Sequence, residues 1–562
     1  MNELSKKAVV LFPVVTCALL MLPLLFGFID TVLPAFGYFP IASRNQFSLS
    51  IWLQLFSYSS LWQSILLTVF TGWAAALLSL VSALWLIMHC YQSRWWQFLE
   101  KTLAPFLAIP HAAMAIALLF LLAPSGWLIR LVSPWLSGFN YPPLWQTTQD
   151  SWGLSLILVL WVKELPFMLL VLMSACSQLP VKRSLALGQS FAYSSQQVWK
   201  DILFPQLIKR IRLPFFTVLA FSLTVVDVAQ IIGPSKPVTL ALLVWQWFSD
   251  SNIEMRLVGA AGSLLLLAVV LLSVTLCIGL EKLYLTKRLS KTMCGIRKAA
   301  RSPVLARGVL VAMVVSLVLS LLVILIWSIT WRWRFPDALP AEWSLHYWQQ
   351  AGSYLLQPLV NSLSIALVSA AISLVLVLGC LEYQLKQARP SRWWSLMMYL
   401  PLLLPQVVFL FGVQVQLFKY RLDGNLITVI WAHLIFVLPY VYLSLAGSYR
   451  AFDKRYMQAA VSLSHSYWRS FISVKLPMLT RPIGLAFAIG FAVSIAQYLP
   501  TLFVGAGRVS TLTTEAVALA SGGDRRVTAV MVIWQTLLPL LVYSAVIAWP
   551  KWRYRHFRGM HS

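Results

Sequence analysis

The chain has 562 residues, of which 60% are hydrophobic and 11% are charged, and its mean hydropathy is +0.78. Soluble domains carry about one charged residue in four, so this composition excludes an ordinary soluble protein and indicates an all-α polytopic membrane protein. The net charge of +26 is divided among segments between apolar stretches, and we therefore expect no nucleic-acid partner.

Apolar stretches of about 20 residues, the length of a helix that crosses a hydrocarbon layer of about 30 Å, recur along the whole chain. The first stretch runs past the length of a signal peptide core, and no small-residue cleavage pattern follows it, so we expect it to be retained. We predict about twelve transmembrane helices, at residues 8–29, 63–89, 102–123, 151–175, 213–233, 257–280, 309–331, 359–383, 396–418, 426–447, 483–503 and 528–550.

The basic residues favour one side of the membrane. If the N-terminus faces the cytoplasm, the inside segments hold 31 Lys and Arg and the outside segments hold 11, while Lys163 lies within a span. This excess is the positive-inside pattern, which predicts that both termini are cytoplasmic.

The cysteine and histidine pattern does not indicate a metal site. The six cysteines lack CxxC spacing, and His111 and His433 have no carboxylate or thiol at ligand spacing. We expect the two histidines to pack within the bundle, and we predict neither a disulfide framework nor a bound metal. The cysteines are Cys17, Cys90, Cys176, Cys277, Cys294 and Cys380.

The sequence repeats itself on either side of a basic segment. Residues 281–308 contain eight basic residues and one acidic residue, which is typical of a cytoplasmic linker. "SRWW" occurs at 93–96 and again at 391–394; four residues alone are also explained as interfacial anchors. We interpret the chain as two six-helix halves, 1–280 and 309–562, joined by this linker.

Each half has one distinctive cytoplasmic loop between its fourth and fifth spans. The stretches 186–205 and 458–477 occupy equivalent positions, and each ends at a proline, Pro205 or Pro477. Their apolar residues recur at three- and four-residue spacing, which predicts a short amphipathic helix that stops at the proline. A neighbouring protein, the membrane surface or the bundle itself could cover its apolar side. The recurring positions are Gly188, Phe191, Ser195, Trp199 and Ile202 in one loop, and Ala460, Leu463, Tyr467, Phe471 and Val474 in the other.

The spacing of these loops resembles the EAA loop of ABC importer permeases. That loop reads Glu-Ala-Ala, three residues, Gly, nine residues, a branched aliphatic, any residue and Leu-Pro. Here Gln458 and Ala186 replace the glutamate, and Ser464 and Ala192 replace the glycine. The spacing is therefore kept, but the charge that could make the family's ionic contact and the glycine that forms its bend are both absent. The fused halves are similar to the permeases of thiamine and ferric-iron importers.

The resemblance implies a type I ABC importer permease of a bacterial inner membrane, with coupling loops at about 182–212 and 448–482. It implies two copies of a separate ABC ATPase subunit that bind ATP and Mg, and an extracytoplasmic binding protein that delivers a small, thiamine-like or ferric-iron-like solute. The chain itself has no G-x-x-x-x-G-K-[ST] phosphate loop, so we expect neither enzymatic activity nor a cofactor in it. The implied coupling positions are Ala186, Leu187, Gly188, Ala192, Ile202, Pro205, Gln458, Ala459, Ala460, Ser464, Val474 and Pro477.

A few polar residues within the predicted spans are candidates for the translocation route. Asp227 and Glu164 are acidic, which is costly in a membrane and indicates a cavity or a partner, and Gln497 lies at a depth similar to Asp227 in the other half. A structural hydrogen bond within the bundle is the alternative for each. Lys163 is adjacent to Glu164, and neighbours on a helix face different ways, so we expect separate partners.

Two other functions fit parts of this pattern. An ion-coupled secondary transporter also has twelve spans in two repeats, but it would not need paired loop helices. A membrane-embedded enzyme would need clustered His, Asp or Ser side chains at one membrane face, which the sequence does not show.

Overall fold

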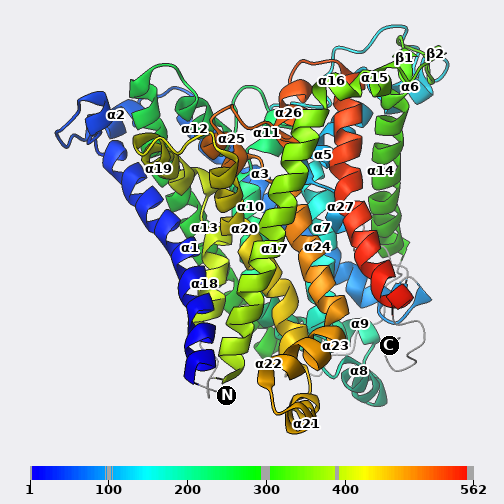
Figure 1. Cartoon of the computed structure of the whole chain (residues 1–562). Helices are drawn as coiled ribbons and strands as arrows, with labels where there is room; N and C mark the ends of the chain where they lie inside the picture. The colour runs from blue at the N-terminus through cyan, green and yellow to red at the C-terminus, as the bar shows by residue number, and fades with distance from the viewer. Residues whose placement is uncertain are drawn as a thin grey trace.

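The computed structural model describes residues 3–94, 96–97, 103, 106–292, 304–386 and 392–553, which form a bundle of long helices (Figure 1). The first half contains α1 (Glu3–Ala35), α2 (Ser50–Phe56), α3 (Leu61–Cys90), α5 (His111–Leu122), α6 (Trp127–Val132), α7 (Leu154–Ser177), α8 (Val181–Ser190), α9 (Ser195–Val198), α10 (Phe204–Thr224), α11 (Asp227–Ile232), α12 (Leu240–Phe248) and α13 (Ile253–Thr292). The second contains α14 (Val304–Ser328), α15 (His346–Gln349), α16 (Ala351–Tyr354), α17 (Leu356–Lys386), α18 (Arg392–Leu403), α19 (Gln406–Lys419), α20 (Leu426–Arg450), α21 (Lys454–Ser464), α22 (Tyr467–Ser470), α23 (Leu476–Met478), α24 (Thr480–Ala496), α25 (Leu499–Gly505), α26 (Leu512–Ala520) and α27 (Arg525–Arg553).

The helices confirm an all-α polytopic membrane protein. Among the described residues, nine helices are long and apolar enough to span a membrane, and eleven spans result if each of two bent helix pairs counts as one. One bent pair is α18 and α19, which meet at 90° beside Pro405, a residue that cannot continue a helix. The remaining predicted span, 213–233, corresponds to α10 and α11, which are separated by an extended residue, Val225.

The two halves repeat the same order of elements. In the first, α7 is followed by α8, α9 and α10, then by a break and the short helix α11. In the second, α20 is followed by α21, α22, α23 and α24, then by a break and the short helix α25. The segment predicted as a linker begins within α13, which continues to Thr292, and residues 293–303 of that prediction lie outside the described residues.

Each half packs its first helix against the other half. Helix α1 contacts α17 and α19, and α14 contacts the equivalent helices α3 and α5. The crossing of α1 and α19 depends on glycine, because a Cβ at Gly412 would lie 1.9 Å from the carbonyl oxygen of Gly27. Small residues at such crossings let two backbones approach closely in a membrane. We call these contacts of α1 and α14 with the other half the exchange of first helices. The exchange joins the two halves through tightly packed helices.

The two ends of the bundle differ. Helix α1 begins, α27 ends and α8 and α21 protrude at one end, which we call the proximal end (Figure 1). The opposite, distal end carries α2, α6, α15, α16 and a small antiparallel hairpin of β1 (Thr330–Arg332) and β2 (Glu342–Trp343). These distal elements come from three stretches of the chain, residues 50–56, 127–132 and 330–354.

The hydrophobic core is shared at the distal end and divided at the proximal end. One large cluster contains residues of both halves, from α5, α11 and α12 to α19, α25 and α26. Two smaller clusters contain the loop helices: one includes Val198, Trp199 and Leu203, and the other includes Phe471 and Leu479. Each of these clusters consists mainly of residues of its own half, and the first helix of the other half adds Leu310 and Met313 to one and Leu20 to the other.

Candidate functional site

The two proximal loops have the same backbone design. Each has a protruding helix, α8 or α21, then a turn, a short helix, and a π-helical segment, Trp199–Leu203 (η2) or Phe471–Lys475 (η3). Pro205 and Pro477 are each the second residue after the π-helical segment, within a helix that continues through that segment. The helix that holds Pro205 continues to Thr224, so the prediction that it stops at the proline is wrong, whereas the helix that holds Pro477 ends one residue later, at Met478.

The loop helices are instead interrupted before the proline, at a left-handed residue. Ala192 has φ +59° and His465 has φ +52°. The loss of the family glycine at Ala192 therefore leaves an alanine in a conformation that glycine tolerates better. The predicted stripes are divided by these turns: Leu463 lies on α21, whereas Tyr467 lies beyond the turn on α22.

Apolar side chains are exposed at the tips of both loops. Leu187 is 55% exposed and Phe191 64% exposed at α8, and Leu463 is 86% exposed on α21. No residue of α21 is buried. Exposed apolar side chains on two protruding helices indicate surfaces that another protein covers.

The implied coupling residues do not share one environment. Gly188 faces inward, because a Cβ there would lie 2.2 Å from Cγ2 of Val198. Those exposed to solvent are Ala186, Leu187, Ala192, Ile202, Gln458 and Ala459, and those partly covered are Pro205, Ala460, Ser464, Val474 and Pro477.

A buried charge network attaches the second loop to a membrane span. Glu382 of α17 forms an ion pair with Lys475 of η3, and each side chain is 3% exposed. The hydroxyls of Tyr449 and Tyr467 also donate to the Glu382 carboxylate. The Lys475 ammonium lies 4.2 Å from the centroid of the Tyr449 ring. Three donors on one carboxylate, with a cation–π contact on the ammonium, compensate for the desolvation of both charges.

The first loop is attached by packing instead. Trp199, equivalent to Phe471, is fully buried and packs its ring edge-on against Tyr91, with ring centroids 5.5 Å apart. Leu203 is buried at the position equivalent to Lys475. One hydrogen bond, 3.2 Å between Nε2 of Gln196 and Nε2 of His89, joins α9 to the end of α3. Lys475, which forms the buried ion pair of the second loop, is thus replaced by an apolar residue, Leu203, in the first.

A second group of polar residues lies where α5, α7 and α11 meet in the middle of the bundle. His111, the first residue of α5, is 3.0 Å through Nε2 from Oε1 of Glu164 on α7. Asp227 begins α11, which packs against α5 and α7. Lys163 turns away and donates to the carbonyl oxygen of Phe106 at 3.3 Å and to that of Ile109. The separate partners predicted for Lys163 and Glu164 are confirmed.

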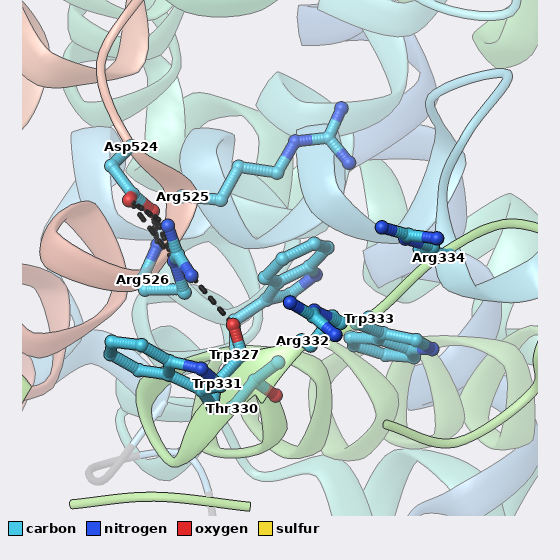
Figure 2. A pocket seen from close by; sticks show the side chains of 9 residues that line it. All are labelled: Trp327, Thr330, Trp331, Arg332, Trp333, Arg334, Asp524, Arg525 and Arg526. Carbon is cyan, nitrogen blue, oxygen red and sulfur yellow. Dashed lines mark hydrogen bonds and ion pairs between the residues drawn. The ribbon is translucent and has the colours of Figure 1, made fainter. Parts of the chain in front are cut away.

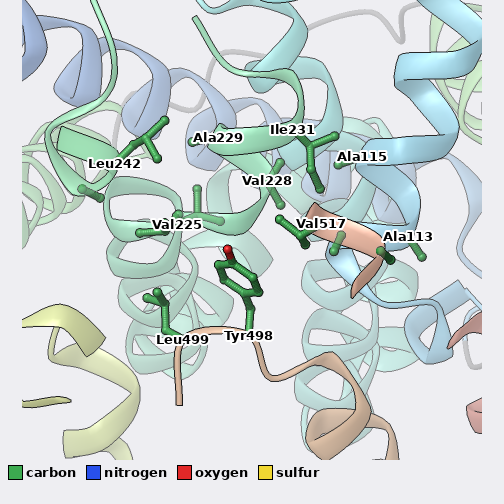
Figure 3. Close-up of a cluster of buried hydrophobic side chains, with 14 of the residues drawn as sticks. Ala113, Ala115, Val225, Val228, Ala229, Ile231, Leu242, Tyr498, Leu499 and Val517 are labelled. Carbon is green, nitrogen blue, oxygen red and sulfur yellow. The ribbon is translucent and has the colours of Figure 1, made fainter. Parts of the chain in front are cut away.

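An apolar cluster formed by both halves includes the residues that follow His111 on α5 and Asp227 on α11 (Figure 3). It combines side chains of α5, α11 and α12 with the start of α25 and with α26, and all of them are buried. Its labelled members are Ala113, Ala115, Val225, Val228, Ala229, Ile231, Leu242, Tyr498, Leu499 and Val517.

A small polar pocket borders the cluster at the α11–α12 connection. It has a volume of about 240 Å³, and its lining includes Gln149, Gln230 and Gln246 beside Ala229 and Leu242 of the cluster. The hydroxyl of Tyr498 donates to Oε1 of Gln230 at 3.0 Å. The pocket thus adjoins the apolar cluster and contacts the second half through Tyr498.

Gln497 and His433, the remaining polar residues considered within the predicted spans, are buried in the bundle. Gln497 is buried at the break between α24 and α25. His433 packs within the bundle as expected, with its two ring nitrogens 2.9 Å from the hydroxyls of Ser494 and Thr501. Within the described ranges, no group of three or more His, Cys, Asp or Glu side chains is arranged to hold a metal ion.

Comparison with known proteins gives the family. The chain is 34% identical over 505 residues to the inner membrane ABC transporter permease protein YnjC of Escherichia coli (strain K12), and the match covers 90% of this chain and 91% of that relative. The chain belongs to the ABC transporter permease family. No protein-family model matches it. The permease is also 24% identical over 246 residues to the putative 2-aminoethylphosphonate transport system permease protein PhnV of Salmonella choleraesuis (strain SC-B67), which covers 42% of this chain and 92% of that relative.

The comparisons confirm the resemblance drawn from the loops and identify the permease as a multi-pass inner membrane protein of an ABC importer. The match to PhnV places nearly the whole of a relative on less than half of this permease, in accord with a repeated chain.

Three residues of these sites were missed in the sequence. Glu382 lies near the end of a predicted span, where its charge could have been singled out in the same way as that of Asp227. Lys475 counted only as one of many cytoplasmic basic residues. His111 packs within the bundle as expected, but Glu164 was not foreseen as the partner of its ring nitrogen.

The contribution of the Glu382–Lys475 pair to stability can be measured. Replacement of one partner, Glu382→Gln or Lys475→Met, should lower the free energy of unfolding by about 3 kcal/mol, because it leaves a buried charge without its partner. The double variant should lose less than the sum of the two. Unfolding in mixed micelles, followed by circular dichroism, measures these values.

The matched control is Glu254→Gln, which removes a partly exposed pair with Arg44 and should cost less than about 1 kcal/mol. Equal losses for the exposed and the buried pair would contradict the anchoring role of Glu382.

At the left-handed turn, in contrast, a substitution should stabilise the permease. Ala192→Gly should raise the free energy of unfolding by about 1 kcal/mol, because it removes the strain of a Cβ at positive φ. Ala186→Gly, within α8, should lower it by a similar amount. Thermal unfolding of the purified permease checks both, and a loss of stability in Ala192→Gly would refute the turn geometry.

Proposed function

We propose that α8 and α21 are the coupling helices of this importer and that each docks on one of two ATPase subunits. Exposed Leu187, Phe191 and Leu463 at the two tips support this role, because an apolar tip of this kind gains free energy when a partner covers it. The energy for transport then comes from ATP and Mg bound to the partner subunits, since the chain has no phosphate-binding loop of its own.

The proximal end is cytoplasmic in this proposal. The excess of Lys and Arg in the segments between spans supports this orientation. Both termini are then cytoplasmic, and the distal elements face an extracytoplasmic binding protein. We assign the halves to residues 1–280 and 309–562, with 281–308 between them, because the same order of elements is repeated on either side.

The continuous helical connection gives the coupling loops their mechanical effect. Helix α9 passes through η2 into α10 without an extended residue, so movement of the first loop also moves a span. In the second half the Glu382–Lys475 pair joins η3 to α17 directly. ATPase subunits that bind one state of the loops more tightly shift the permease toward that state.

The proposed route passes from the amide-lined pocket through the apolar cluster to the polar group at Asp227 and Glu164, with Gln497 at the equivalent break of the second half. Two acidic side chains in a membrane interior favour a cationic solute. Of the two cargoes that the sequence resemblance implies, thiamine-like and ferric-iron-like, these residues fit an organic cation such as thiamine better. No group among the described residues has the ligand number that a bare metal ion requires.

Docking of α8 and α21 on the ATPase subunits can be tested by introducing a charged residue at each apolar tip. Leu187→Asp and Leu463→Asp should each reduce ATP-driven uptake in proteoliposomes more than tenfold, because the partner would bury an unpaired carboxylate. The ATPase should no longer copurify with the doubly substituted permease. The control Leu463→Met retains an apolar tip and should retain uptake; full activity of both aspartate variants would refute the docking surface.

The route is tested with radiolabelled thiamine as the probe. Asp227→Asn should raise the KM for uptake about tenfold or more, because it removes a negative charge on the route while keeping the side-chain shape. Asp250→Asn, in the distal connection after α12, should leave uptake unchanged. Unaltered KM in Asp227→Asn, or a complete assembly that takes up no thiamine, would contradict this assignment of cargo.

A further inference from the structure

A second pocket lies at the distal end, away from the proposed route. It has a volume of about 350 Å³ and lies between the last turn of α14, strand β1 and the first turn of α27 (Figures 1 and 2). Trp327, Trp331 and Trp333 contribute three indole rings to its wall. We call it the arginine–tryptophan pocket.

Four arginines line this pocket with a single carboxylate. Asp524 accepts hydrogen bonds from Nε of Arg526 at 2.8 and 3.0 Å. Burial raises the pKa of Asp524, but the hydrogen bonds and charge of Arg526 outweigh it and hold this pKa below its usual value. Asp524 is therefore ionised at neutral pH, and it neutralises Arg526 and no other arginine of the pocket.

The other arginines retain positive charge. Arg525 donates to Oγ of Ser125 at 2.9 Å, and its guanidinium lies 5.4 Å from the Trp327 ring centroid, but it makes no ion pair within the described part of the chain. Arg334 also makes none there. Arg332 pairs with Glu342 at 3.4 Å, and because both side chains are about half exposed this pair is weak.

A further positive charge lies behind the wall. Arg130 is buried, and it donates to the carbonyl oxygens of Ser125 at 3.0 Å and Arg334 at 2.7 Å. Its charge and that of Arg525 repel each other, while Asp337 attracts it. Like charges close together away from water are costly unless an anion lies between or beside them. The pocket is therefore an electrostatic site for an anion.

The surroundings of the pocket indicate which anion. Helix α14 exposes an apolar stripe at Val311, Val315, Val318, Leu322 and Leu325, at alternating spacings of four and three residues. The stripe runs along one face and ends one turn or less from Trp327. In a membrane such a face contacts acyl chains, and tryptophans mark the level of the headgroups.

We propose that the arginine–tryptophan pocket binds the phosphate of an anionic phospholipid whose acyl chains lie along the exposed stripe of α14. The positive wall supplies the attraction for the phosphate, and the stripe supplies the apolar contact that a soluble phosphate ion lacks. The site lies in the leaflet at the distal end and is separate from the coupling loops and the proposed route.

The test uses the full-length permease in a neutral detergent, titrated calorimetrically with short-chain phosphatidylglycerol, short-chain phosphatidylcholine and inorganic phosphate. Phosphatidylglycerol should bind at least tenfold more tightly than either of the others. Arg525→Gln and Arg334→Gln should each weaken its binding at least tenfold, and Arg508→Gln, a distal arginine paired with Asp423, should leave it unchanged.

Arg334 makes no side-chain ion pair among the described residues, so Arg334→Gln decides the question even if Arg525→Gln fails to fold. Equal binding of the two phospholipids, equal binding of inorganic phosphate, or the same loss in Arg508→Gln would overturn the proposal.

Discussion

The firm attachment of two solvent-exposed loops to membrane-spanning helices is the constraint on which the account of this permease depends. A loop that moved independently of the spans could not change a path through the membrane. In the second half the attachment is a carboxylate, Glu382, held by an ammonium and two phenols. In the first it is Trp199 packed beside Leu203. The buried pair is directional and requires specific partners, whereas the apolar contact tolerates small changes of geometry.

The division of the core complements these attachments. At the proximal end each loop lies in a cluster formed mainly by its own half, while a single large cluster joins the halves at the distal end. The exchanged helices α1 and α14 add a second connection between the halves. On the proposed route, the apolar cluster around Tyr498 and Val517 is the contact between the halves that would have to separate for a solute to pass.

Much of the fold was predictable because a membrane imposes strong rules on composition. Hydrophobic length gave the spans, and proline-marked loops at equivalent positions gave the repeat. The breaks were harder: the 90° bend at Pro405 lies within one apolar stretch, and the left-handed residue of the second loop, His465, follows the position of the family glycine instead of occupying it. The exchange of first helices was not predictable, since an apolar helix face reads the same whether it contacts lipid or protein.

The site was predictable only in part, because its contacts join distant residues. The loop spacing identified the protruding helices, but Glu382 and Lys475 are 93 positions apart, and His111 and Glu164 are 53 apart. A single sequence shows that each side chain is polar and placed near a membrane, and it does not show which residue it meets. The inward position of Gly188 also depends on a contact, with Val198, that forms only when the turn is in place.

The most direct test is the distance between the two loop tips during the ATPase cycle. Spin labels on cysteines introduced at 187 and 463, in a background without the native cysteines, report this distance by double electron–electron resonance in the complete assembly. The account predicts that the distance distribution shifts when ATP is bound and returns after hydrolysis. An unchanged distribution in an assembly that still imports solute would contradict it.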